Sequence, residues 1–212
     1  MSVYQYIRWA LLVLGLVLAA CNRTPEIRPL PADAVILAFG DSLTFGTGAA
    51  GGEDYPSVLQ SLIDRRVINA GIPGEVSGAG LKRLPALLRQ HRPTLVIICH
   101  GGNDILRRQS LQRTRENIQR MVDLVRASGA GAVLIGVPQF GIFLSPAPFY
   151  TELAEHNGIP IQASVLSDIL KNPSLKSDQI HPNAAGYRQL AVQIADLLVE
   201  SGAIDKIRHS SD

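Results

Sequence analysis

The sequence has few cysteines, little net charge and no apolar run long enough to span a membrane. Its 212 residues include two cysteines, Cys21 and Cys99, which excludes a framework of several disulfides. The formal net charge is +2, and the basic residues are scattered, so neither DNA nor RNA is expected as a partner. Histidines, cysteines and acidic residues do not cluster at ligand spacing, so we expect no metal ion and no other cofactor.

The first apolar run, residues 10–20, is typical of an export signal. As a helix these residues rise only about 16 Å, whereas a bilayer core needs about 30 Å. Together with Arg8 before it, the run predicts a signal peptide over residues 1–20. The run ends in Leu-Ala-Ala followed by Cys21, which resembles the lipobox of bacterial lipoproteins and implies a diacylglyceryl group on the Cys21 sulfur. The alternative is an ordinary cleaved signal with an incidental cysteine.

Residues 21–33 are predicted to be an anchor cysteine and a spacer, because three prolines favour an extended backbone there. Asn22 resembles the residue after the lipobox cysteine in lipoproteins that are sorted to an outer membrane. We therefore expect a protein of the bacterial cell envelope, anchored by lipid to the outer membrane or facing the periplasm. Residues 34–203 would form one domain, and residues 204–212 a frayed tail.

Short apolar runs alternate with longer amphipathic segments through this domain. Continuous Val, Ile and Leu runs are typical of parallel strands that are buried on both faces. The predicted strands are residues 34–39, 67–69, 95–99, 132–137 and, more weakly, 159–162. The alternation predicts an α/β fold: a doubly wound, flavodoxin-like parallel sheet of about five strands with helices on both faces.

Two single residues give further expectations. Pro85 lies in the helical segment 78–90, where a proline most simply restarts a helix at its first turn. Cys99 ends a predicted strand and should be a buried thiol.

Polar residues follow the predicted strands in four blocks. Ser42 stands in Gly-Asp-Ser-Leu after the first strand, Gly74 follows the second, and Asn103 stands in Gly-Gly-Asn-Asp after the third. Asp178 and His181 lie just before the last helix. Each block alone is weak evidence, since glycine-containing turns are common. Because ligands bind at the carboxyl ends of such strands, Ser42, Gly74 and Asn103 should meet at one edge of the sheet.

These four blocks resemble the SGNH hydrolase family, also called GDSL esterases, over nearly the whole domain. The branch of thioesterase I, lysophospholipase L1 and arylesterase looks most similar. The resemblance implies Ser42, His181 and Asp178 as catalytic residues. It also implies an oxyanion hole made by the Ser42 N–H, the Gly74 N–H and the Asn103 side-chain amide.

The residue types suit acyl transfer. A serine hydroxyl needs a base to take its proton near neutral pH, and a neutral imidazole such as that of His181 can do so. The Asp178 carboxylate would fix the histidine tautomer. We expect a monomeric serine ester hydrolase that forms an acyl-enzyme on Ser42: a carboxylesterase or arylesterase, or else an acyl thioesterase or lysophospholipase. The alternatives are an acetyl esterase acting on cell-envelope carbohydrate and a catalytically idle binding lipoprotein.

Two other motifs are rejected. Residues 46–51 match the spacing G-x-G-x-x-G, but they do not lie directly between a strand and a helix, as a dinucleotide site requires. The G-x-S-x-G signature of α/β-hydrolases is absent around Ser42.

Overall fold

The structure is a computed structural model that describes residues 24–139 and 144–207. The predicted signal peptide, Cys21, Asn22 and the last five residues of the predicted tail lie outside this range. Within the described residues, no helix is both long and apolar enough to cross a bilayer.

Five parallel strands form one sheet in the spatial order β2-β1-β3-β4-β7. They are β1 Val35–Gly40, β2 Arg66–Gly71, β3 Leu95–Cys99, β4 Gly131–Ile135 and β7 Ile161–Gln162. Every residue of β3 is buried, whereas the edge strand β2 is partly exposed. The short strands β5 Pro138–Gln139 and β6 Ser145–Pro146 pair separately and antiparallel. The prediction of a doubly wound parallel sheet is confirmed.

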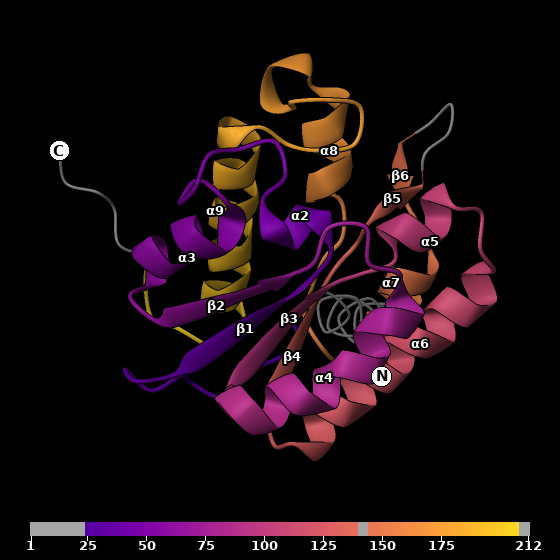
Figure 1. The fold of residues 1–212 in the computed structure, drawn as a ribbon. Helices are drawn as coiled ribbons and strands as arrows, with labels where there is room; N and C mark the ends of the chain where they lie inside the picture. Colours follow the sequence, from indigo (N-terminus) through magenta and orange to yellow (C-terminus); the bar gives the residue numbers. More distant parts are fainter. Residues whose placement is uncertain (1–23, 140–143, 208–212) are drawn as a thin grey trace, which may run out of the picture.

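Helices cover both faces of the sheet (Figure 1). Helices α3 Tyr55–Ile63 and α9 Ala184–Glu200 pack together on one face, and α4 Ser77–His91 and α6 Leu111–Ala127 pack on the other. The remaining helices are α2 Ser42–Phe45, α5 Gly102–Leu106, α7 Phe149–Asn157, α8 Val165–Lys171 and a 3-10 helix at Pro173–Leu175. The chain turns from β1 outward to β2 and then back to β3. The order of the sheet therefore reverses between the carboxyl ends of β1 and β3, where ligands bind in such folds.

Pro85 lies inside α4, so the prediction that it restarts a helix is wrong. An interior proline removes one backbone hydrogen bond and costs about 3 kcal/mol. Leu84 and Leu88, on either side, are both buried against the core. Burial of a leucine contributes roughly 1.5–3 kcal/mol, so the two together offset that cost and the helix continues.

The segment before β1 lies against the end of α9. The Ile27 N–H donates to the Ser201 carbonyl at 2.8 Å, and the Leu30 N–H donates to the Ala203 carbonyl at 2.8 Å. The same segment borders a cavity shared with Thr94, which directly precedes β3. These contacts place the first described residues at the amino ends of the strands, the edge opposite Ser42.

Gly40 ends β1 where it lies against β3. A Cβ atom there would lie 2.4 Å from the Cys99 carbonyl oxygen and 2.1 Å from Thr44 Oγ1. Cys99 itself is free and fully buried, as predicted.

Since the backbone of β3 cannot move away from a Cβ atom at Gly40, we expect Gly40→Ala to lower the free energy of unfolding by roughly 1–3 kcal/mol. Urea unfolding measures this, and equal midpoints for Gly40→Ala and wild type would contradict it. Gly51→Ala is the control, because no atom lies within 4 Å of its Cβ position.

Candidate active site

Ser42 is the first residue of α2, directly after β1. The preceding Asp41 caps this short helix, because its Oδ1 accepts a hydrogen bond from the Leu43 N–H at 3.0 Å. Gly46 ends the helix in the left-handed conformation, with φ of 97°, which suits glycine. The tight turn between strand and helix leaves Ser42 at the carboxyl edge of the sheet.

The loop before α9 brings His181 to Ser42. His181 Nε2 lies 3.0 Å from Ser42 Oγ, and His181 Nδ1 lies 2.7 Å from Asp178 Oδ2. The other Asp178 oxygen accepts from the backbone N–H groups of Ile180 and His181, both at 2.8 Å. The three side chains therefore form a continuous hydrogen-bonded chain, although Ser42 and His181 are 139 residues apart.

The surroundings of Asp178 favour its ionised form. Partial burial alone would raise the pKa of this carboxyl, but the hydrogen bonds from the His181 ring and from two backbone N–H groups lower it below its ordinary value. Asp178 is therefore a carboxylate at neutral pH and accepts a proton-bearing Nδ1, which leaves Nε2 able to accept a proton from Ser42.

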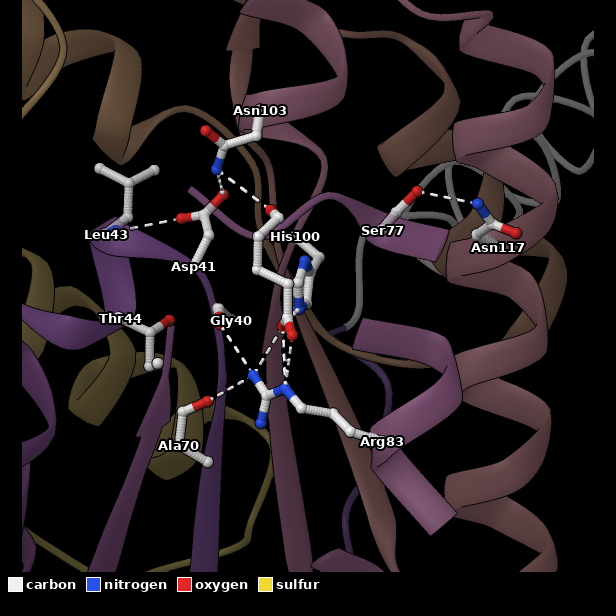
Figure 2. A network of polar contacts seen from close by, with 12 residues as sticks. Gly40, Asp41, Leu43, Thr44, Ala70, Ser77, Arg83, His100, Asn103 and Asn117 are labelled. Atoms are coloured by element: carbon white, nitrogen blue, oxygen red, sulfur yellow. Dashed lines mark hydrogen bonds and ion pairs between the residues drawn. The ribbon is translucent and has the colours of Figure 1, made fainter. Parts of the chain in front are cut away.

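Asn103 lies in α5, after β3, and its amide is occupied by protein oxygens (Figure 2). Its Nδ2 donates to Asp41 Oδ2 at 3.2 Å and to the Glu75 carbonyl at 3.1 Å. An amide nitrogen has two protons, so both are engaged here. A substrate oxyanion would have to share one of these two rather long bonds.

One narrow pocket brings most of the predicted site residues together. Ser42, Asn103 and His181 line it together with Asp41 and Gly102, and its apolar wall consists of Leu43, Leu106, Val137 and Ile180. Gly74 is not among the lining residues. It has a φ of 77° in the loop after β2, and its carbonyl accepts from Arg107 Nη2 at 2.9 Å. Among the described residues, neither the Ser42 N–H nor the Gly74 N–H has a hydrogen-bond partner.

Asp41 makes two separate contacts in the site. Besides capping α2 through its Oδ1, it accepts from the Asn103 amide through its Oδ2. Burial raises the pKa of Asp41 above its ordinary value; His100, the Leu43 N–H and the Asn103 amide counteract this only in part. Asp41 therefore couples the capped turn at Ser42 to the side chain of Asn103.

The raised pKa of Asp41 predicts a pH dependence of stability. Above the ordinary pKa of 3.8, the unfolded chain releases this proton more readily than the native protein does. The free energy of unfolding therefore falls as the pH rises from 3.8 through the raised pKa of Asp41 in the native protein. Asp41→Asn keeps an oxygen for the Leu43 N–H and lacks this titration. Urea unfolding between pH 4 and pH 8 should show the wild type losing stability relative to Asp41→Asn as pH rises, and a constant difference would contradict the expectation.

A second carboxylate, Asp104, supports the loop after β2. It accepts from the Ser77 N–H at 2.7 Å and from Ser77 Oγ at 2.6 Å. Ser77 is the first residue of α4, whose N-cap residue, Val76, makes no side-chain bond. Asp104 therefore caps α4 from another helix. Because the two segments are remote in sequence, no local motif predicts this contact.

Among residues 24–139 and 144–207, no group of His, Cys, Asp and Glu could hold a metal ion.

The sequence matches known ester hydrolases. A model of the GDSL-like lipase/acylhydrolase family matches residues 38–189. The arylesterase of Vibrio mimicus is 32% identical over 205 residues, which cover 92% of this chain and 98% of the relative. Thioesterase 1/protease 1/lysophospholipase L1 of Escherichia coli strain K12 is 31% identical over 191 residues, which cover 86% of this chain and 88% of the relative.

Solved structures agree with this relationship. The psychrotrophic esterase EstA from Pseudoalteromonas sp., in a structure inhibited by monoethylphosphonate, superposes with a TM-score of 0.69 at 30% identity. The match covers 78% of this chain and 97% of EstA. The chain therefore belongs to the GDSL-like lipase/acylhydrolase family, the SGNH hydrolases, and is an ester hydrolase.

Proposed function

We propose that this ester hydrolase acts through an acyl-enzyme on Ser42, with His181 as general base and Asp178 as the group that orients it. The hydrogen-bonded chain from Ser42 Oγ through the His181 ring to Asp178 carries this proposal. His181 Nε2 takes the hydroxyl proton while Oγ bonds to the ester carbonyl carbon. The same proton then passes to the leaving alkoxide as its bond to carbon breaks. In the second half, His181 takes a proton from water as the water oxygen bonds to the acyl carbon. It then returns that proton to Ser42 Oγ as the acyl–Oγ bond breaks, which frees the acid.

The negative charge that develops on the carbonyl oxygen needs donors. The backbone N–H groups of Ser42 and Gly74 suit this role, because neither has a partner among the described residues. The Asn103 amide would be the third donor by redirecting one of its two long bonds. Loss of one such donor typically costs about 10² to 10³ in rate.

The wall of the pocket supports one class of substrate. Leu43, Leu106, Val137 and Ile180 border Ser42 and His181, and apolar walls suit hydrocarbon acyl or aryl groups better than sugar hydroxyls. The relatives named arylesterase and thioesterase/lysophospholipase support the same choice. We therefore propose carboxylic esters or thioesters with apolar acyl or aryl groups as substrates.

Labelling and a substrate panel test this function. A fluorophosphonate probe should label the purified domain, and peptide mass analysis should place the label on Ser42. The relative inhibited by monoethylphosphonate supports this choice of probe. The panel comprises p-nitrophenyl esters of increasing chain length, an acyl thioester and a lysophospholipid. Activity confined to acetyl esters would favour carbohydrate deacetylation instead, and folded protein that neither reacts nor hydrolyses would indicate a binding lipoprotein.

We further propose that a lipid on Cys21 anchors the protein, which acts as a monomer, in the bacterial cell envelope. The apolar run ending in Leu-Ala-Ala before Cys21 supports this proposal. Cys21→Ala should then move the protein from the membrane fraction to the soluble fraction of the producing bacterium, with kcat unchanged. Cys99→Ala is the matched control and should stay in the membrane fraction, because its thiol is buried in the domain. Membrane association of Cys21→Ala equal to that of the wild type would argue against the anchor.

A further inference from the structure

A charged network lies beneath the loop that follows β2 (Figure 2). Arg83 of α4 contacts the Glu75 carboxylate in two ways: its Nε lies 2.8 Å and 2.9 Å from the two oxygens, and its Nη2 lies 2.7 Å from Oε2. The side chains are only 21% and 7% exposed, respectively. The guanidinium also stacks over the Phe39 ring at 4.4 Å. The ion pair is thus largely shielded from water, and the carboxylate contacts and the Phe39 ring fix the orientation of the guanidinium.

The same guanidinium joins two strand ends to this loop. Its Nη2 donates to the Ala70 carbonyl at 2.8 Å and to the Gly40 carbonyl at 3.2 Å. Gly40 ends β1 two residues before Ser42, and Ala70 lies near the end of β2, four residues before Gly74. Arg83 therefore contacts the backbone that leads into two of the three proposed oxyanion donors.

The third donor is reached through Glu75. While the carboxylate of Glu75 pairs with Arg83, its backbone carbonyl accepts from Asn103 Nδ2 at 3.1 Å. Glu75 also directly follows Gly74. A shift of Glu75 would therefore move the Gly74 N–H and the Asn103 amide together.

His100 is a second side chain beside the Glu75 carboxylate. The fully buried His100 ring has its Nε2 3.2 Å from Glu75 Oε2. Gly80 makes room for this ring, since a Cβ there would lie 2.5 Å from Nε2. Arg83 holds both oxygens of the Glu75 carboxylate, whereas His100 lies at 3.2 Å from Oε2. Without Arg83, the shielded carboxylate would keep the longer contact with His100 but lose its closest partner, which favours movement of the loop toward water.

We propose that Arg83 is a positioning residue for the oxyanion hole: through Glu75 and the strand-end carbonyls it fixes the loop of residues 72–76 relative to Ser42. This inference rests on the proposed function. Small displacements of donors are costly in catalysis, and misplacement by about 1 Å can cost 10²-fold in rate. The attachment of α4 itself does not need Arg83, because Leu84 and Leu88 bury this helix against the core.

Kinetics of Arg83→Met, Arg83→Lys and the control Arg89→Met test the proposal. Arg89 lies on the same helix and is exposed. For p-nitrophenyl butyrate, Arg83→Met should lower kcat about 10- to 100-fold with KM within threefold of wild type, and it should weaken inhibition by an alkylboronic acid by the same factor. That inhibitor forms a tetrahedral adduct on the serine with one oxygen in the proposed oxyanion hole. If Arg83 had only a structural role, the affinity for the inhibitor would not change relative to KM. Arg83→Lys should recover part of kcat, and Arg89→Met should match wild type.

The outcomes separate this inference from the proposed function. If wild type hydrolyses esters and folded Arg83→Met keeps kcat within threefold, the positioning role is refuted while the esterase proposal stands. If wild type neither hydrolyses esters nor reacts with the probe, both fail. Should Arg83→Met be unfolded at the assay temperature, Glu75→Gln decides, because it keeps the carbonyl that binds Asn103 and loses only the ion pair. Its kcat should fall at least threefold at unchanged KM, and an unchanged kcat would overturn the proposal.

Discussion

Ser42→Ala is expected to lower kcat/KM for p-nitrophenyl esters at least about 10⁴-fold without lowering the melting temperature. Removal of a nucleophilic serine in a triad costs up to about 10⁶ in kcat, and the donors and the binding site provide the residual rate. The Ser42 hydroxyl contacts His181 at 3.0 Å and is not part of the core, so its loss should leave packing intact. Steady-state kinetics and thermal unfolding of the purified domain measure both quantities.

Ser61→Ala is the matched control for Ser42→Ala. Its hydroxyl lies on the exposed side of α3 and donates to the Ser57 carbonyl at 3.3 Å. Kinetics like those of the wild type are expected. Hydrolysis by Ser42→Ala at a tenth of the wild-type rate or more would identify another nucleophile and remove the basis for the acyl-enzyme.

The sheet and its helical faces were predictable because the apolar patterns are strong. The run at residues 95–99 forms the central strand β3, and helices cover the sheet on both faces. Its residues are therefore uniformly apolar and all buried. The prediction for Pro85 was wrong for a physical reason. The free energy that an interior proline costs a helix is offset by the burial of the two leucines beside it, Leu84 and Leu88. That burial depends on tertiary contacts that the segment alone does not reveal.

The meeting of Ser42 and Asn103 followed from topology, since both directly follow strands of the parallel sheet, whereas the place of His181 beside Ser42 was implied by the family resemblance. The network of Arg83 and Glu75 beneath the proposed oxyanion hole could not be predicted from the sequence. Arg83 lies on a helix with many basic and polar residues, and nothing in its local sequence distinguishes it from the exposed Arg89. What distinguishes Arg83 is the position of two carbonyls, Gly40 and Ala70, which depends on how β1 and β2 end side by side.

The same limit applies to the Asn103 amide. The family resemblance implied a donor near Ser42, but the acceptors that occupy the amide, Asp41 and the Glu75 carbonyl, come from two other segments. These bonds at 3.1 Å and 3.2 Å orient the amide before substrate arrives. In the proposed mechanism one of these two bonds must still be redirected when charge develops on the substrate oxygen, so the amide is held in place but not yet aimed at that oxygen.

Asp178→Asn is the second change with a large expected effect, about 10⁴-fold in kcat. Asp178 Oδ1 accepts from two backbone N–H groups, so an asparagine would keep its oxygen there and turn its NH₂ group toward His181 Nδ1. Facing a donor, Nδ1 must become an acceptor, which moves the ring proton to Nε2. The imidazole could then no longer accept the proton of Ser42, although every atom of the site would stay near its present position.

Kinetics distinguish this tautomer effect from a general disturbance of the loop. Asp178→Asn should keep KM within threefold, and in the Ser42→Ala background it should add no further loss, because the members of a triad act as a unit. Asp168, an exposed carboxylate on α8, pairs with Lys171, and Asp168→Asn should match wild type. If Asp178→Asn retained a tenth of the wild-type kcat, the carboxylate would be no more than a support for its loop, and the 2.7 Å contact with His181 would have no part in the choice of tautomer.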